Sequence, residues 1–370
     1  MTMITADERA AIRESFARLL TDQCSEDDVR RTMEVEAGYD PALWQSMADM
    51  GILGLIVAPE YGGIGAGPVE VEMIMEEAGA RLLAGPLLSS AVLAAGLLSA
   101  SKDTGAQSRL LPALASGEQK ATVALTGDKG SWTTDGVSVE ARGEGDVTKL
   151  FGTASFVTAA HVADILLVVA TTPDGLGAFE VDSAAPGLSI ERLESWDRTQ
   201  RLSRIVFDGV SARALEGADE AAIEHALDLA RVALAGEQAG AARRIFDITI
   251  EYLKTRVQFG RPIGGFQAIK HMAADLLIEV ESATSAARAA AQAIEDDAPD
   301  RQVLVNLAAF ACADAFGEVA ATAIQMHGGI AFTWEHPAHL YLRRARADAQ
   351  LFGSSDLYRE RYVAALENAA

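Results

Sequence analysis

The sequence is short of basic residues, aromatic residues and cysteine. It has 31 Lys and Arg against 53 Asp and Glu, a formal net charge of -22. Proteins that bind nucleic acid neutralise phosphates with clustered basic side chains, so we expect no nucleic-acid partner. Its two cysteines, Cys24 and Cys312, lie far apart and give no disulfide framework. Because no disulfides are expected, a reducing cytoplasm is the expected location. The six histidines do not form a convincing metal-binding pattern.

Long uninterrupted apolar runs are also missing. A transmembrane helix needs about 18 or more apolar residues in sequence, and no stretch approaches this length. Residues 1–16 are charged from Asp7 onward and lack the apolar region of a signal peptide. We therefore expect no membrane insertion. At 370 residues and 49% hydrophobic composition, rich in Ala, Leu, Val and Ile, the chain predicts a large and mainly helical core.

Three regions of different hydrophobic pattern follow one another along the chain. Residues 6–116 have apolar positions at helical spacing, interrupted by a glycine-rich loop at 58–68. Helical periodicity returns near Asp219, is broken near 260–265, 295–299 and 328–337, and predicts four or five long helices. Between these regions, short β-type runs predict strands at 121–125, 165–170, 177–181 and 204–207. We predict a turn at 171–175 and a division into domains 1–118, 119–213 and 214–370.

Two segments of the C-terminal region carry a family resemblance. Residues 252–271 read YLKTRVQFGRPIGGFQAIKH and join a charged helix end, a glycine-proline turn and a second helix. Farther along, 325–329 reads QMHGG, followed by FTWEH at 332–336 and YLRR at 341–344. In this order the segments resemble the acyl-CoA dehydrogenase family, in the actinobacterial branch that includes paired-subunit, steroid side-chain-type members. The resemblance spans essentially the whole chain. It implies an N-terminal helical domain, an antiparallel middle β domain and a C-terminal four-helix bundle.

The resemblance implies a flavin adenine dinucleotide (FAD) cofactor. Thr126 matches the Thr beside the flavin pyrimidine, although Gly127 and Asp128 replace the usual Glu-Pro. Phe156 and Thr158 match the aromatic residue that shields the ring and the Thr that contacts N5. Taken alone, each segment is better explained as an ordinary strand.

Two further elements resemble the part of the family's site that binds the cofactor across a subunit interface. The matching residues are Arg256, Gln258 and Phe259 in the first element and Gln325, Gly328 and Gly329 in the second. Arg provides planar donors for phosphate oxygens, and glycine lets the backbone approach a phosphate closely. A surface Arg at a helix end is the rival explanation, which the presence of both elements disfavours. The resemblance implies a homo- or hetero-oligomer, a dimer or tetramer.

An acyl-CoA site is implied by residues 227–231, LDLAR, which resemble the segment that positions the thioester. Asp228 and Arg231 would contact the substrate. They also lie on one helical face, so a simple ion pair on the helix surface is an equal alternative. Arg231 together with Arg343, Arg344 and Arg346 could form a basic patch for CoA, but each Arg alone is better explained as a solvated residue.

The catalytic carboxylate expected from the resemblance is missing. The family pattern near the C-terminus is aromatic, Glu, Gly, Thr, whereas residues 351–355 read LFGSS and place Gly353 at the Glu position. Glycine cannot accept a proton. The second position used within the family is Ala230 here. Glu237 lies two helical turns later on the same face, among small apolar residues, and is the candidate base. A helical Glu is, against this, usually solvated.

Two functions remain open from the sequence. In the first, Glu237 removes the alpha proton of an acyl-CoA while a hydride passes from the beta carbon to flavin N5, and an electron-transfer flavoprotein-like acceptor takes the electrons. In the second, the chain is a catalytically silent subunit that completes a partner's flavin site with Arg256 and Gln325. Gly353 and the altered loop after Thr126 favour the silent subunit. The retained flavin and substrate elements favour the first, which is the preferred interpretation of the sequence.

Overall fold

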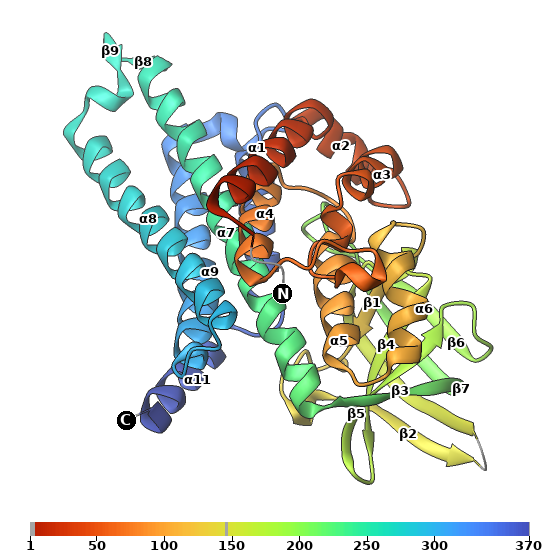
Figure 1. The fold of residues 1–370 in the computed structure, drawn as a ribbon. Helices are drawn as coiled ribbons and strands as arrows, with labels where there is room; N and C mark the ends of the chain where they lie inside the picture. Colours follow the sequence, from red (N-terminus) through yellow and green to blue (C-terminus); the bar gives the residue numbers. More distant parts are fainter. Residues whose placement is uncertain (1–3, 145–146, 370) are drawn as a thin grey trace. The chain divides into compact units, whose positions relative to one another are not determined.

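The computed structural model describes residues 4–144 and 147–369, and its elements follow the order helix, β, helix (Figure 1). It contains two compact units. The first unit is built mainly from Arg30–Gly67 and Ala84–Ala230, and the second from Asp7–Val29, Pro68–Leu83 and Arg231–Ala370. The N-terminal third therefore supplies segments to both units. The predicted three-part division follows the order of elements along the chain rather than this partition.

The predicted helical character of the N-terminal region is confirmed. Its elements are α1 (Ala6–Gln23), α2 (Glu26–Glu34), α3 (Pro41–Asp49), the short helices η1 (Ile52–Gly54) and η2 (Pro59–Tyr61), α4 (Pro68–Ala80), the π-helix η3 (Leu87–Ala94), α5 (Ala95–Ala100) and α6 (Thr104–Ala115). Asp40 begins α3 by accepting hydrogen bonds from the backbone N–H groups of Ala42 and Leu43. Asp103 caps α6 in the same way. These short polar side chains satisfy backbone donors that the first helical turn leaves unpaired.

The middle region forms the predicted β sheet. Its strands are β1 (Ala121–Ala124), β2 (Val139–Glu144), β3 (Val147–Thr158), β4 (Ile165–Thr172), β5 (Gly175–Asp182), β6 (Leu188–Leu193) and β7 (Leu202–Asp219), with the short helices η4 (Thr134–Gly136) and η5 (Ala160–Val162) between them. The strand order is β1-β4-β2-β3-β7-β5, with β6 paired to β7. The predicted turn joins β4 to β5, where Thr172 pairs with Gly175.

The sheet differs from the expected antiparallel arrangement at one edge. β1 pairs with β4 in parallel, and β2 also meets β4 in parallel at Glu140 and Thr171. The remaining pairings of this sheet, among the described residues, are antiparallel. Parallel neighbours need a long connection, and the chain between β1 and β4 supplies it with β2 and β3. Sequence patterns give strand positions but do not show which strand a crossover brings alongside.

The C-terminal region carries most of the candidate site residues, on its helices and in the segments between them. They are α7 (Glu220–Thr255), α8 (Gln267–Glu295), α9 (Arg301–His327), α10 (Ala338–Asp348) and α11 (Ser355–Ala369); between them lie the two-residue strands β8 (Val257–Gln258) and β9 (Arg261–Pro262) and the short helices η6 (Ile263–Gly265) and η7 (Gly328–Phe332). The three predicted breaks are confirmed. Figure 1 shows α7, α8 and α9 side by side, and their shared core is mostly alanine, including Ala235, Ala287 and Ala308. Small side chains let these helices approach closely.

Among residues 4–144 and 147–369, one helical stretch is long and apolar enough to span a membrane, judged by length and composition alone. It is 301–332, and 56% of its apolar window is buried within the protein. Cys312 and Phe316, in the middle of the stretch, are fully enclosed by other protein atoms. A core helix of a soluble protein passes the same test.

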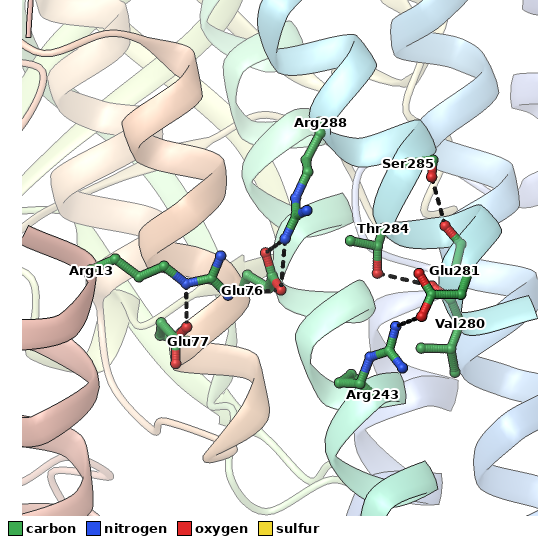
Figure 2. A network of polar contacts seen from close by, with 9 residues as sticks. All are labelled: Arg13, Glu76, Glu77, Arg243, Val280, Glu281, Thr284, Ser285 and Arg288. Carbon is green, nitrogen blue, oxygen red and sulfur yellow. Dashed lines mark hydrogen bonds and ion pairs between the residues drawn. The ribbon is translucent and has the colours of Figure 1, made fainter. Parts of the chain in front are cut away.

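Ion pairs connect α1, α4 and α8 within the second unit (Figure 2). Arg13 of α1 donates to Glu77 at 2.6 Å and to Glu76 at 2.9 Å. Arg288 of α8 donates to the same Glu76 at 3.0 Å. Glu72, one turn earlier on α4, is buried, and burial raises the pKa of its carboxyl to about 8. This core therefore holds charged and polar groups as well as alanine.

Candidate functional site

The β domain brings the Thr126 and Phe156 segments together. Thr126 follows β1 and is buried; its hydroxyl donates to the Ser131 carbonyl at 2.5 Å, and its own carbonyl accepts from the Ser155 N–H at 2.7 Å. Phe156 lies at an irregularity in the pairing of β3 with β7 and has a φ of 57°, which is rare for an aromatic residue. Two segments predicted to face a flavin are thus neighbours in one unit.

A polar contact fixes the loop after Thr126. Asp128 accepts a hydrogen bond from the Ser155 hydroxyl and two more from Arg204, at 2.8 and 2.9 Å. These hydrogen bonds, chiefly those from Arg204, lower the pKa of the Asp128 carboxyl to about 2. Gly127 and Asp128, which stand where the resemblance implies Glu-Pro, thus form a loop whose carboxylate has partners of its own. Sequence reasoning noticed the replacement but not Arg204, which is distant in the chain.

Thr158, the last residue of β3, is partly exposed. Its carbonyl accepts a hydrogen bond from the hydroxyl of Thr122 at 2.7 Å. Thr122 is on β1, four residues before Thr126. The ends of β1 and β3 are therefore fixed to each other, which places Thr126, Phe156 and Thr158 on the same part of the sheet.

The end of α7 presents the Arg256 element to solvent. The Arg256 N–H still donates to the Tyr252 carbonyl at 2.8 Å, so the helical hydrogen bonding continues to this residue. The β8–β9 hairpin then turns through Phe259, whose φ is 52° and whose side chain is 91% exposed. Arg256 and Gln258 are exposed as well. A large aromatic residue in this strained and exposed position is unusual for a monomeric surface.

The end of α9 presents the second element. Gln325 and Gly329 are exposed, and Gly328 has a φ of 67°, a conformation that favours glycine. A Cβ atom added at Gly328 or Gly329 would meet no other atom within 4 Å, so the backbone here borders open space. The Tyr252 hydroxyl donates to the His327 carbonyl at 3.3 Å, and the two rings lie 4.5 Å apart. Tyr252 thus joins the end of α7 to the end of α9.

This donor set fits the phosphate part of a flavin dinucleotide. Arg256 offers a guanidinium and Gln325 an amide, and the backbone at Gly328–Gly329 borders open space, with the Gly328 N–H donating to the Ile324 carbonyl. Guanidinium groups are common donors to phosphate oxygens, and glycine lets the backbone approach a phosphate closely. Exposed Phe259 and Phe332 add aromatic surface nearby in the sequence. The residues present are therefore suited to hold such a cofactor.

The predicted substrate residues, Asp228 and Arg231, are both buried on α7. The guanidinium of Arg231 lies 5.8 Å from the centre of the Tyr358 ring. The suggested basic patch with Arg231 is wrong for Arg344, which is also buried. Arg343, in contrast, lies over the Trp334 ring at 5.4 Å. The neighbouring arginines of α10 point to different surroundings because adjacent residues project from different faces of a helix.

The two positions at which the resemblance implies a catalytic carboxylate, Ala230 and Gly353, carry none and are enclosed. Ala230 is fully buried. Gly353 is also buried and has a φ of 141°, a conformation in the range that favours glycine. A Cβ atom at this position would lie 3.0 Å from the Leu357 side chain and 3.0 Å from the Tyr358 ring, tighter than nine in ten real Cβ contacts. Gly353 therefore could not be exchanged for glutamate without movement of its neighbours.

Glu237, the candidate base, forms an ion pair with Arg344. The two side chains are only 6% and 1% exposed. Arg344 also donates to the carbonyl of Leu83 at 3.4 Å. Gly79 of α4 packs directly on the Glu237 backbone, so a larger residue at position 79 would separate the two helices. Small neighbours are present as expected, but no local pattern pointed to the buried cation, which comes from α10.

Comparison with known proteins decides the family. Residues 6–118 match the model described as "Acyl-CoA dehydrogenase, N-terminal domain", and residues 197–366 match "Acyl-CoA dehydrogenase, C-terminal domain". The chain belongs to the acyl-CoA dehydrogenase family. It is 33% identical to acyl-CoA dehydrogenase IpdE2 of Mycobacterium tuberculosis, over 95% of each chain. It is 32% identical to IpdE2 of Mycolicibacterium smegmatis, over 94% of this chain and 95% of that protein.

Solved structures of acyl-CoA dehydrogenases show the same fold. A variant of the Tcur3481-Tcur3483 steroid ACAD matches with a TM-score of 0.89 and 32% identity, over 98% of both chains. The ChsE4-ChsE5 complex from Mycobacterium tuberculosis matches with a TM-score of 0.91 and 29% identity, over 99% of both chains. The predicted fold class and actinobacterial branch are confirmed. As an acyl-CoA dehydrogenase, the protein is an oxidoreductase that acts on acyl-CoA, and its family implies the use of FAD.

Three residues of this acyl-CoA dehydrogenase make contacts that the sequence did not predict. They are Arg344 beside Glu237, Tyr358 beside Gly353, and Arg204 beside Asp128. Each is a long side chain that reaches a residue more than four positions away in the sequence. The aromatic pattern of α11 was the one available signal, since Tyr358 lies five residues after Gly353 and a helix begins between them.

Proposed function

We propose that this chain takes part in FAD-dependent dehydrogenation of an acyl-CoA thioester as a subunit without a catalytic base, completing the flavin site of a partner chain. The observation that carries the proposal is the state of the three base positions. Ala230 and Gly353 have no carboxylate, and the carboxylate of Glu237 is bound by Arg344. A carboxylate can act as the base only where it is within hydrogen-bond reach of the substrate's proton.

The burial of the Glu237–Arg344 pair supports a structural role for it. Removing one member of a buried ion pair leaves an uncompensated charge, at a cost of about 3–5 kcal/mol. Transfer of a substrate proton to Glu237 would neutralise its carboxylate. The buried guanidinium of Arg344 would then be left without a compensating charge. Proton transfer at this position therefore carries a penalty that a base with no buried cationic partner avoids.

The exposed elements support the role toward a partner. Arg256 and Gln325 are exposed donors, the backbone at Gly328–Gly329 borders open space, and Phe259 is almost fully exposed. Groups of this kind are expected where a chain meets another chain and its cofactor. The ChsE4-ChsE5 complex and the Tcur3481-Tcur3483 enzyme, which are named as pairs of chains, give the same indication.

In the proposed reaction the base comes from the partner chain and removes the alpha proton of the acyl-CoA. FAD, when bound, supplies the acceptor for the hydride from the beta carbon. The guanidinium of Arg256 and the amide of Gln325 would bind and orient the phosphate part of that cofactor. The steroid name of one relative suggests a bulky, steroid-type acyl group, and an electron-transfer flavoprotein-like acceptor would take the electrons.

A second candidate is a self-sufficient dehydrogenase in which Glu237 is the base. It is favoured by the position of Glu237, a buried carboxylate on the same helix as Ala230 and two turns farther on. In that case Arg344 would have to separate from Glu237 during the reaction.

Anaerobic visible spectra of the purified full chain separate the two candidates. The flavin-loaded chain is mixed with hexanoyl-CoA and with a steroid side-chain acyl-CoA, alone and after co-expression with each other acyl-CoA dehydrogenase chain of the same genome. Our proposal expects bleaching in one co-expressed pair and not in the chain alone. In that pair, Arg256→Ala in this chain should abolish bleaching, whereas Glu237→Gln should retain it if the variant folds.

Bleaching by the chain alone that disappears in Glu237→Gln would establish the second candidate instead. Arg344→Lys, which keeps a cation beside Glu237, is the matched control for loss of fold. A pair that bleaches with Arg256→Ala as fast as with the native chain would contradict the proposed role in the partner's site.

A further inference from the structure

Tyr358 of α11 lies where a side chain at position 353 would extend. A Cβ atom built on Gly353 would be 3.0 Å from Cζ of Tyr358 and 3.1 Å from its hydroxyl oxygen. The Tyr358 hydroxyl donates to the carbonyl of Phe352 at 2.6 Å, which fixes the ring over the turn. The ring and the turn are both buried.

Arg231, on α7, lies against the Tyr358 ring. Its guanidinium carbon lies 5.8 Å from the centre of the Tyr358 ring, within the range of a cation–π contact. Arg231 is one of the two residues predicted to contact the substrate, and it is buried. The ring therefore adjoins both the position that lacks the base and a residue expected at the thioester.

The Tyr358 ring occupies the space beside Gly353, and this explains why position 353 is a glycine. The φ of 141° strains any other residue there, and the ring and Leu357 leave little room for a Cβ atom. Two separate constraints thus favour glycine at one position. A base could not be regained by a single substitution.

We propose that Tyr358 closes this chain's own base position, filling the volume in which the carboxylate of a catalytic chain would stand. This inference rests on the proposed function, because it gives that function a physical cause. The position is occupied by an aromatic ring and its covering guanidinium. The space beside Gly353 is therefore filled by protein atoms and is not an empty pocket.

The first test is a double-mutant cycle on the full, flavin-loaded chain. Gly353→Ala adds only the Cβ atom, and we expect it to lower Tm by about 5 °C or more. Tyr358→Ser removes the ring. If Tyr358 fills the volume, the double variant should lose less stability than the sum of the two single losses. The strain from φ is present on both sides of the cycle and cancels.

Tyr362→Ser is the matched control, since Tyr362 lies one turn later on α11 and packs edge-on against Phe310. Combined with Gly353→Ala, it should give an additive loss. Tyr358→Phe keeps the ring and should relieve little of the crowding. An additive result for Tyr358→Ser, or an unchanged Tm for Gly353→Ala, would overturn the proposal.

The second test asks whether the closed position is the base position. In Gly353→Glu/Tyr358→Ser, the new carboxylate can take the alpha proton of hexanoyl-CoA, leaving the electron pair on the alpha carbon beside the thioester carbonyl, and return a deuteron in D2O. No oxidant is needed. We expect NMR to show exchange at least about tenfold above the native chain and Gly353→Glu alone, since each factor of ten is a barrier change of about 1.4 kcal/mol.

Suppose that the stability losses of Gly353→Ala and Tyr358→Ser are non-additive, but that Gly353→Glu/Tyr358→Ser exchanges no alpha proton. Tyr358 would then fill this volume, but the volume would not be the base position. If Gly353→Glu alone exchanges the alpha proton and keeps the Tm of the native chain, Tyr358 does not close position 353. These outcomes differ from a failure of the proposed function. Bleaching of flavin by the native chain alone would refute the missing base, whereas the stability cycle would still report whether Tyr358 fills the site.

Discussion

The middle of α7 and its C-terminal end differ sharply in how open they are. Around Glu237 and Gly353 the side chains are enclosed, and the available polar groups are bound to one another. At Arg256 and Phe259 the side chains project into solvent. The positions predicted for proton transfer are therefore closed, while those predicted for cofactor phosphates are open. This contrast is what a subunit that serves a partner's site would need.

The largest effect on stability should come from breaking the buried ion pair between Glu237 and Arg344. Glu237→Ala leaves the Arg344 guanidinium buried without its carboxylate, and we expect a loss of about 3–5 kcal/mol in the free energy of unfolding. Urea denaturation followed by circular dichroism measures it. The matched double variant Glu237→Gln/Arg344→Met removes both charges and should recover most of the loss. A loss below about 1 kcal/mol for Glu237→Ala would mean that the pair is not formed.

Glu72 of α4 packs against Gly236 of α7, and so it tests the enclosed middle of α7 through pH. Its carboxyl has a pKa near 8 in the folded chain, against 4.5 as an ordinary value, mainly because it is buried. Between these values the unfolded chain releases a proton that the folded chain keeps, so stability should fall as pH rises from about 4.5 to 8. Glu72→Gln should remove that part of the slope and stabilise the chain at pH 9 by roughly 2–4 kcal/mol, a discounted conversion of the shift.

Unfolding by urea at several pH values from 4 to 9 checks this prediction. Glu279→Gln, an exposed carboxyl on α8, is the control and should leave the pH profile nearly unchanged. Identical pH slopes for the native chain and Glu72→Gln would show that Glu72 is accessible to water.

At the open end, Arg256→Ala should affect the assembled enzyme and spare the fold. The loss of charge-assisted hydrogen bonds to phosphate is worth about 1.5–3 kcal/mol, or roughly 10- to 150-fold in cofactor affinity. Flavin release from the oligomer, followed by fluorescence, measures it. Arg261→Ala on the same hairpin is the control, because that guanidinium stacks 4.0 Å from the Phe266 ring centre. Equal losses from both variants would contradict a specific role for Arg256.

The smallest effect on folding should come from Phe259→Ser. An almost fully exposed side chain contributes little to the stability of its own chain, so we expect a change within about 0.5 kcal/mol. Oligomer dissociation, measured by analytical ultracentrifugation, should nevertheless increase, because the exposed ring would be buried against a partner. Phe332→Ser offers a second exposed ring for comparison. A large loss of monomer stability with unchanged assembly would reverse the contrast between the middle of α7 and its C-terminal end.

Much of the fold and part of the site followed from local sequence signals. Breaks near Gly260, Pro299 and Gly328 were predictable because glycine and proline interrupt helical periodicity. The strands around Ala121 and Ile165 were predictable from short apolar runs. Their parallel pairing was not, because pairing joins residues distant in the chain. The assignments of Thr126, Phe156, Arg256 and the other site residues to roles stay predictions.

The sequence by itself determined the family, the order of helical and β regions, and the absence of a carboxylate at Gly353. These depend on residue identity and spacing along the chain. Only the tertiary structure decided that Arg344 binds Glu237, that Tyr358 adjoins Gly353, and that Gly328 borders open space. A carboxylate can act as a base or as one half of an ion pair, and the difference depends on which distant side chain folding brings within a few ångströms of it.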